Sequence, residues 1–299
     1  MKEVAKELQA IYAKFEPWLE TRRVGKLRKG RMFDCCVRSA TTKLFDFNTS
    51  IVTLALQEKP IPAFFVAGSL RGSCEDLIVL GFLQDVPNTQ RDEILSNWLF
   101  HEIHTNVLTQ TAFFRKNRPF QNILATSDQT VLPKHVGMVH PLWKALGFNL
   151  KPDAIAPSTW AMAKKAGISE VYEFFYRFSC DIVHFNPAVL LRFGWADDPS
   201  KLRFHASNFD LYYQSFGLVY GAYLWCLFLQ LLRRNLRGSK ESRTAEKELV
   251  KWLKQHERWP EMVTREEMNM PPAKPNFLAL LARIAQASEH KPLIRRRRR

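Results

Sequence analysis

The stretch "MFDCCVRSATTKLFDFNTSIVTLALQ" (32–57) repeats apolar residues at the spacing of an α-helix, not at the alternating spacing of a strand. The next stretch, "PAFFVAGSLRGSCEDLIVLGFLQD" (62–85), does the same and begins beside Pro60 and Pro62, where a helix can start. Such blocks recur along the chain, which has only 12 glycines and 16 prolines among its 299 residues. The pattern predicts an all-α fold, a multi-helix bundle of about eight to ten helices.

Further helices are expected on both sides of these two stretches. The sequence predicts an amphipathic helix over 2–16 that Pro17 interrupts. Later helices are predicted over 89–116, 158–167, 168–185, 206–236, 241–257 and 276–289. Ser169 is the expected cap of the helix over 168–185, and Asn186 with Pro187 should end it. Two short alternating apolar runs around "DDPS" predict a small β-hairpin insertion over 190–205.

The periodicity fades over 117–157, where five prolines predict an irregular connector with one short helix near "PLWKALG". The chain is therefore expected to have three parts. Residues 1–31 form an N-terminal helix and a basic link, and 32–257 form the helical bundle, with sub-bundles 32–116 and 158–257 on either side of 117–157. The last part is a C-terminal link, helix and arginine-rich tail over 258–299.

The cysteines and the N-terminal stretch predict a cytoplasmic protein. None of the five cysteines forms a CxxC pair and each lies in an apolar-periodic segment, so all are expected to be reduced, buried thiols. Charges scattered through "MKEVAKELQAIYAKF" are unlike the apolar core of a secretion signal. The apolar stretch 216–232 is near the length of a membrane span, but it contains Gln230 and is interpreted as a buried central helix.

Positive charge is the main pointer to a partner. The formal net charge is +15, and the terminal arginines 295–299 account for only five of it. A polyanion such as RNA is therefore a plausible partner. The stretch "TRRVGKLRKGR" (21–31) is either a solvated link or a patch that faces anions, with nucleic-acid contacts expected from Arg22, Arg23, Lys26, Arg28, Lys29 and Arg31.

The stretch "EFFYRFSCDIVHFNP" (173–187) carries the candidate catalytic pair. Arg177 and His184 are seven residues apart, close to two helical turns, so their side chains are expected on one face. An arginine can hold a phosphodiester through two hydrogen bonds, and a histidine can move protons near neutral pH. These are the two roles that metal-free RNA cleavage requires.

An arginine followed by a histidine at this spacing resembles the HEPN superfamily of helical ribonucleases and nucleotide-binding domains. The wider stretches "SLRGSCEDLIVLGFL" (69–83) and 160–195 also resemble an uncharacterised bacterial family of helical proteins, over about half the chain. In that family an arginine–glutamate helix accompanies a tyrosine–serine–histidine helix. The HEPN resemblance implies a homodimer that acts on RNA, with a toxin or antiphage-defence role. Phe178 follows the arginine where HEPN nucleases commonly have a polar residue, so binding without cleavage stays open.

Arg71 and Glu75 stand four residues apart on an otherwise apolar helix. The functional interpretation brings them to Arg177 and His184 across the bundle, where Glu75 orients the histidine and Arg71 adds positive charge for phosphate. In this interpretation His184 is the general acid/base and Arg177 stabilises the charge of the phosphorane. The alternatives are an ordinary surface pair for Arg71 and Glu75, and a structural pair for Arg177 and His184.

No cofactor or metal ion is expected. The glycines form no phosphate-binding loop, and the histidines of "FHEIHT" (100–105) miss the spacing of a zinc helix. The sequence thus leaves three readings of function. They are a HEPN-like RNA-binding or metal-independent ribonuclease protein, a non-enzymatic helical interaction or scaffold protein, and a membrane-associated protein held by 216–232.

Overall fold

The computed structural model describes residues 1–24, 31–59, 61–118, 120–121, 127–184, 186, 189, 205, 210–256 and 258–262. All regular secondary structure in these residues is helical, as the sequence predicts. The expected hairpin over 190–205 and the expected helix over 276–289 lie outside the described residues, apart from the single residue 205.

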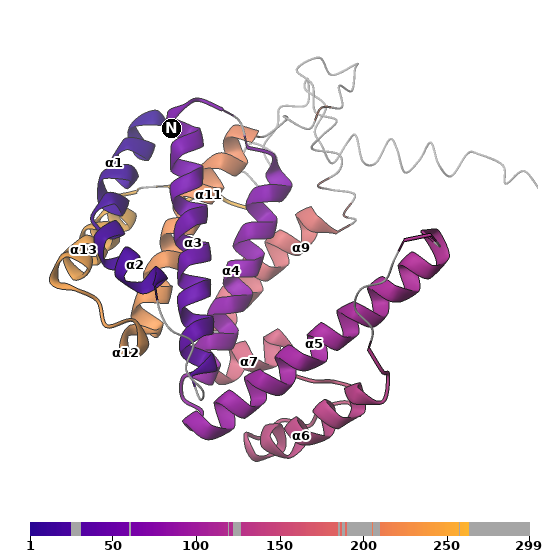
Figure 1. The fold of residues 1–299 in the computed structure, drawn as a ribbon. Helices are drawn as coiled ribbons and strands as arrows, with labels where there is room; N and C mark the ends of the chain where they lie inside the picture. Colours follow the sequence, from indigo (N-terminus) through magenta and orange to yellow (C-terminus); the bar gives the residue numbers. More distant parts are fainter. Residues whose placement is uncertain are drawn as a thin grey trace, which may run out of the picture.

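Three long helices form the centre of the molecule. They are α3 (Met32–Leu56), α4 (Ala63–Leu83) and α11 (Asp210–Leu231), which pack against one another. On one side, α1 (Lys2–Ala13) packs against α3, and α13 (Lys240–Gln255) packs against α1 and α11 (Figure 1). The short helices α2 (Glu16–Arg23) and α12 (Arg233–Leu236) contact one end of α3.

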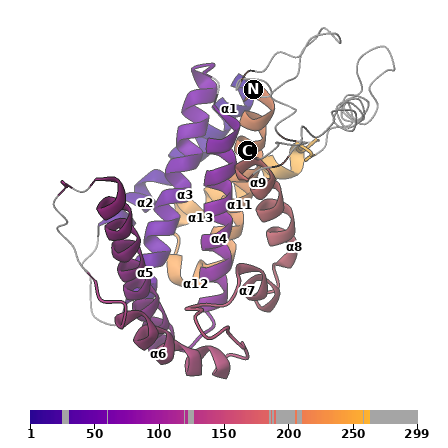
Figure 2. The same ribbon diagram turned by 90° about the vertical axis from the view of Figure 1, so that its right-hand side faces the viewer.

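The other side of α4 is covered by a run of short helical segments. These are α7 (Thr159–Lys165), α8 (Ser169–Val171), the π-helix η1 (Tyr172–Tyr176) and α9 (Arg177–Val183). A separate pair, α5 (Asn88–Asn117) and α6 (Val131–Ala145), extends away from the bundle (Figure 1). In the view of Figure 2 this pair lies on the opposite side of α4 from α8 and α9.

Two glycines let α11 approach α3 closely. A methyl group at Gly221 would overlap the side chain of Asn48, and one at Gly217 would lie 2.5 Å from Ile51 Cδ1. Asn48 is buried and donates from Nδ2 to the carbonyl of Gly221 at 3.2 Å. The helix predicted over 206–236 is therefore seated inside the bundle as α11, but it ends at Leu231 and the separate short helix α12 follows; residues 206–209 lie outside the described residues. Among the described residues no helix is long and apolar enough to cross a membrane.

Several predicted details are wrong for local reasons. Pro17 lies in the first turn of α2, where proline is tolerated, so it begins a second helix. Ser169 makes no capping hydrogen bond, whereas Ser158 accepts one from the amide of Ala161. The connector contains a 15-residue helix, α6, which continues through Pro141. Of the five cysteines, which are all free thiols, only Cys74 and Cys226 are buried.

Candidate functional site

The segment η1–α9 has two chemically different faces. Its phenylalanines pack toward α11, with the rings of Phe178 and Phe216 stacked 3.8 Å apart and those of Phe175 and Tyr220 5.2 Å apart. Its polar side chains Tyr176 and His184 contact α4 instead. Burial of the aromatic face thus fixes which side chains are presented to α4.

The π-helix brings two tyrosines together on this second face. The rings of Tyr172 and Tyr176 stack with centroids 4.4 Å apart and an interplanar angle of 19°. In a π-helix each hydrogen bond spans five residues, one more than in an α-helix. Such π-helical turns are frequent at functional sites. The extra residue rotates the residues from Arg177 onward about the helix axis relative to those before it. A uniform α-helical spacing, as assumed from the sequence, therefore places their side chains on the wrong face.

Arg71 of α4 is the centre of the polar contacts. Its Nη1 lies 2.9 Å from His184 Nε2, and its Nη2 donates to the hydroxyl of Tyr176 at 3.0 Å. Its Nε donates to Glu75 Oε1 at 3.4 Å, and its guanidinium carbon lies 4.6 Å from the centroid of the Tyr176 ring. All three guanidinium nitrogens are therefore engaged. We refer to Arg71, Glu75, Tyr176 and His184 as the Arg71 cluster.

The contact with Arg71 defines the state of the histidine. A guanidinium can only donate hydrogen bonds, so His184 Nε2 must be the acceptor. Acceptance at Nε2 requires the tautomer that carries its proton on Nδ1, which is assigned from the direction of this hydrogen bond. His184 is exposed, and it ends α9 with extended backbone angles, φ −101° and ψ 170°. A neutral imidazole that faces solvent beside a permanent cation has the properties of a general base.

Neighbouring groups favour a fixed charge on Arg71 and a neutral Tyr172. Burial acts to lower the pKa of Arg71, but the negative charges that Cys180, Tyr176 and Glu75 can carry raise it above its ordinary value. Burial, followed by the neighbouring Tyr176, raises the pKa of Tyr172. The site therefore keeps a cation close to a protonated Tyr172 at neutral pH.

The predicted catalytic residues are brought together only in part. Arg71, Glu75 and His184 meet across the α4–α9 contact, but Glu75 bonds Arg71 and no hydrogen bond joins it to the histidine. Arg177 is exposed, and no hydrogen bond or ion pair joins it to another described residue. Neither Arg177 nor His184 is buried, so they do not form the buried polar pair that was the structural alternative.

Tyr176 is the member of the cluster that the sequence reasoning missed. The only signal for it was the tyrosine in the tyrosine–serine–histidine helix of the family that the sequence resembles. That resemblance assigned no partner or role to the tyrosine. Ser179 and Cys180 of the same stretch do not join the cluster. Ser179 is buried and donates to backbone carbonyls of its own helix, and no side-chain hydrogen bond joins Cys180 to His184.

The basic stretch 21–31 divides into paired and unpaired arginines. Arg23 is paired with Glu20 and Asp46, which neutralise it as a nucleic-acid contact. Arg22 donates to the carbonyl of Arg237 at 2.9 Å, and Arg31 is exposed. Both line a cavity at the end of α3. Lys26, Arg28 and Lys29 lie outside the described residues.

Comparison with known proteins supports the second of the two resemblances. No curated protein and no solved structure matches the chain. The model of a family of unknown function (DUF5677) matches residues 41–201, which include every member of the Arg71 cluster. Because the match covers more than half of the 299 residues, the chain belongs to this family of unknown function.

Proposed function

We propose that the protein is a HEPN-like RNA-binding protein that cleaves RNA at the Arg71 cluster without a metal ion. The observation that carries this proposal is the 2.9 Å contact between Arg71 Nη1 and His184 Nε2 at an exposed helix end. It joins a phosphate-binding group to a proton acceptor, the minimum for transesterification at a phosphodiester. The net charge of +15 favours a polyanionic substrate.

The reaction begins when a phosphate of the RNA takes the place of His184 on Arg71. This exchange frees Nε2 to accept the proton of the adjacent ribose 2′-hydroxyl, whose oxygen then attacks phosphorus. Arg71 stabilises the negative charge of the phosphorane, and Glu75 holds the guanidinium in position. The hydroxyl of Tyr176 accepts from Arg71 and keeps its own proton available.

Cleavage is complete when the bond between phosphorus and the 5′-oxygen breaks. The departing oxygen takes a proton from Tyr176, which then recovers one from the imidazolium of His184 through solvent. The products are a 2′,3′-cyclic phosphate and a 5′-hydroxyl. This assignment gives Arg71 the role that the sequence gave to Arg177, and leaves Arg177 as a contact for a neighbouring phosphate.

The proposal is tested with purified protein and end-labelled single-stranded RNA in EDTA. We expect wild type to cleave and to leave cyclic phosphate ends, and His184→Ala to lose cleavage by about two orders of magnitude or more. Asp181→Ala is the matched control, because Asp181 is exposed on the same helix and has no hydrogen bond in the described residues. Circular dichroism confirms that each variant is folded.

Each result separates the readings of function. Wild-type protein that binds RNA through Arg71 but leaves it intact would remove the nuclease half of the proposal and keep the binding half. Protein that neither binds nor cleaves RNA would refute both halves and favour the interaction or scaffold reading.

A further inference from the structure

A second polar site lies at the opposite end of the central helices from His184. It is a cavity of about 450 Å³ formed where the end of α2, the start of α3, the start of α5 and the end of α12 meet. This volume falls within the range of about 300–1,000 Å³ that small-molecule sites occupy. The lining contains two aspartates and six arginines, namely Arg22, Arg31, Arg38, Arg91, Arg234 and Arg237.

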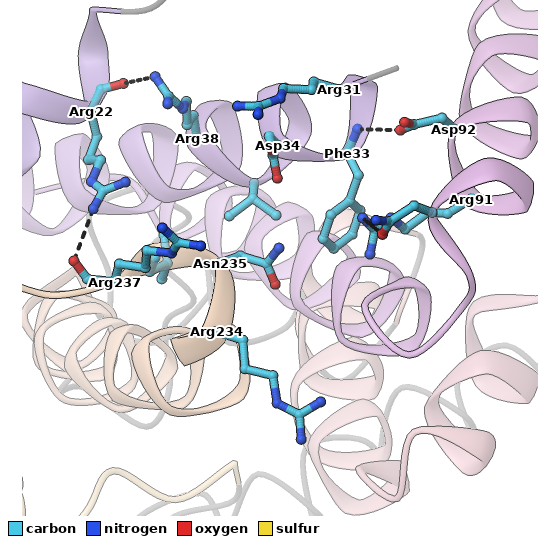
Figure 3. A pocket seen from close by; sticks show the side chains of 13 residues that line it. Arg22, Arg31, Phe33, Asp34, Arg38, Arg91, Asp92, Arg234, Asn235 and Arg237 are labelled. Atoms are coloured by element: carbon cyan, nitrogen blue, oxygen red, sulfur yellow. Dashed lines mark hydrogen bonds between the residues drawn. The ribbon is translucent and has the colours of Figure 1, made fainter.

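The arginines surround the cavity from separate elements. Figure 3 shows the side chains of Arg31 and Arg38 along one side and Arg237 on the other, while Arg91 and Phe33 close one end. Six arginines against two aspartates leave a formal excess of four positive charges in the lining, although Arg234 also forms an exposed ion pair with Asp85 at 4.0 Å. Like charges held this close repel one another, so the arrangement favours a bound anion.

The positive charge is not neutralised within the described part of the chain. No carboxylate there lies within ion-pair distance of Arg22, Arg31, Arg38, Arg91 or Arg237. Asp92 uses Oδ1 to accept from the amide of Phe33 at 3.1 Å. Arg38 donates to backbone carbonyls at 3.2 and 3.4 Å. The guanidinium groups of Arg22, Arg38 and Arg91 are thus held in place by neutral acceptors, which leave their charge available.

Arg91 is a largely buried cation that forms no ion pair with a described carboxylate, although Asp92 and Asp34 are near enough to act on its charge. It is only 8% exposed, and its guanidinium carbon lies 3.8 Å from the centroid of the Phe33 ring. Its Nη2 donates to Asn88 Oδ1 at 2.7 Å, but its buried Nε has no hydrogen-bond partner, and the same is true of Arg22 Nε. Burial lowers the pKa of both arginines. An anion in the cavity would supply the missing acceptor for each Nε and would add to the negative charge that faces these arginines.

The helix ends add to the same field. The cavity takes residues from the first turns of α3 and α5, two helices of 25 and 30 residues whose N-termini carry partial positive charge. Neither N-cap residue makes a side-chain capping bond, and among the described residues only the amide of Phe33 is occupied in the first turn of α3, by Asp92. Free backbone amides at helix starts bind phosphate groups in many proteins, and here they supplement the arginines.

We propose that this cavity binds a small anion with two or more linked phosphate groups. Arginine forks match phosphate oxygens, and an excess of four charges calls for more than one phosphate. A compact cavity suits a small ligand better than an extended RNA strand, which follows a groove. The site is separate from the Arg71 cluster, and only Asn88, Arg91 and Asp92 of its lining lie within the family match.

The test is isothermal titration calorimetry of the full chain at about 0.15 M salt, where surface charges are screened beyond about 8 Å. The probes are inorganic tripolyphosphate, ATP and inorganic phosphate. We expect tripolyphosphate to bind at one site per chain and single phosphate to bind at least about tenfold more weakly. Equal affinities for ATP and tripolyphosphate would show that only the phosphates are bound, and tighter binding of ATP would add nucleoside contacts.

A double variant tests whether the cavity is the site. Arg31→Gln with Arg237→Asn removes two exposed arginines, and asparagine tolerates the left-handed φ of 42° at position 237. It should weaken tripolyphosphate binding by about tenfold or more. Arg115→Gln with Arg118→Gln removes the same charge at the far end of α5 and should leave binding unchanged.

Three outcomes would overturn the proposal. The first is that tripolyphosphate shows no saturable binding. The second is that the Arg31/Arg237 and Arg115/Arg118 double variants weaken tripolyphosphate binding equally. The third is that the Arg31/Arg237 variant loses RNA binding while tripolyphosphate does not bind to the protein at all. Failure here would leave the proposed function intact, because His184→Ala alters no residue of this cavity.

Discussion

Arg71 carries more of the candidate site than any other residue, because its guanidinium bonds Glu75, Tyr176 and His184 at once. One of the two interpretations of the sequence grouped Arg71 and Glu75 with Arg177 and His184, because their residue types suit phosphate chemistry. The sequence does not reveal which arginine meets the histidine. Helical spacing favours Arg177 on the same helix, whereas the contact is made across two helices and depends on their packing.

Tyr176→Phe tests whether the hydroxyl of Tyr176 matters apart from its ring. The variant keeps the stacking on Tyr172 and the contact with the Arg71 guanidinium, but it removes the proposed proton donor. We expect cleavage to slow by about tenfold or more with RNA affinity little changed. Cleavage rates and filter binding measure the two quantities, and an unchanged cleavage rate would exclude Tyr176 as the donor.

Cys226 should make the free energy of unfolding fall as the pH rises in the alkaline range. Burial, with a smaller contribution from Glu246, raises the pKa of its thiol from 9.0 to about 12. The raised pKa stabilises the native state fully below pH 9, and this contribution is lost as pH rises toward 12, because the unfolded thiol ionises first. Urea denaturation of Cys226→Ala should therefore show a shallower loss of stability between pH 9 and 11 than wild type. Equal slopes would contradict the assignment.

At the scale of elements, periodicity predicts the helices well and their irregularities poorly. The predicted ranges 32–57, 62–85 and 89–116 agree closely with α3, α4 and α5, because long apolar stripes leave little choice of structure. The π-helix at Tyr172–Tyr176 was not predicted, since it is stabilised by packing between α4 and α11. In α6, Trp143 and His140 bond backbone carbonyls of 154–155, contacts with no sequence signal.

The α3–α11 contact should be intolerant of a methyl group. Gly221→Ala would overlap Asn48, which cannot move without losing its hydrogen bonds to the carbonyls of Leu44 and Gly221. We expect a loss of about 1–3 kcal/mol in the free energy of unfolding. Gly68→Ala in α4 is the matched control, because no atom lies within 4 Å of its added methyl group. It should gain about 0.5–1 kcal/mol, and a similar loss in both variants would contradict the packing.

At the scale of the whole molecule, the prediction of a homodimer has a specific surface to test. Leu99 and Ile103 lie four residues apart on α5 and are 42% and 45% exposed. Exposed apolar side chains at this spacing form a stripe that a second copy can cover. Light scattering should give twice the chain mass of 34.8 kDa for wild type. Leu99→Glu with Ile103→Glu should reduce it to one chain, whereas Leu211→Glu, on exposed α11 surface, should not.

The overall architecture could be predicted from the sequence, but the arrangement of its parts could not. An all-helical bundle follows from the spacing of apolar residues, and α11 as a buried helix follows from its uncharged length. The arginine cavity could not be foreseen, because residues 22–38, 88–92 and 234–237 meet only in the folded chain. Charge patterning pointed to the stretch 21–31 without showing that Arg22 and Arg31 line a cavity.

The most direct test of the account compares Arg71→Gln with Arg177→Gln in the metal-free cleavage assay. Both variants remove one arginine, Arg71 from the contact between α4 and α9 and Arg177 from the exposed surface of α9. We predict that Arg71→Gln abolishes cleavage while the folded protein remains intact, and that Arg177→Gln lowers RNA affinity with the cleavage step at saturating RNA little changed. Full cleavage by Arg71→Gln and none by Arg177→Gln would contradict the account.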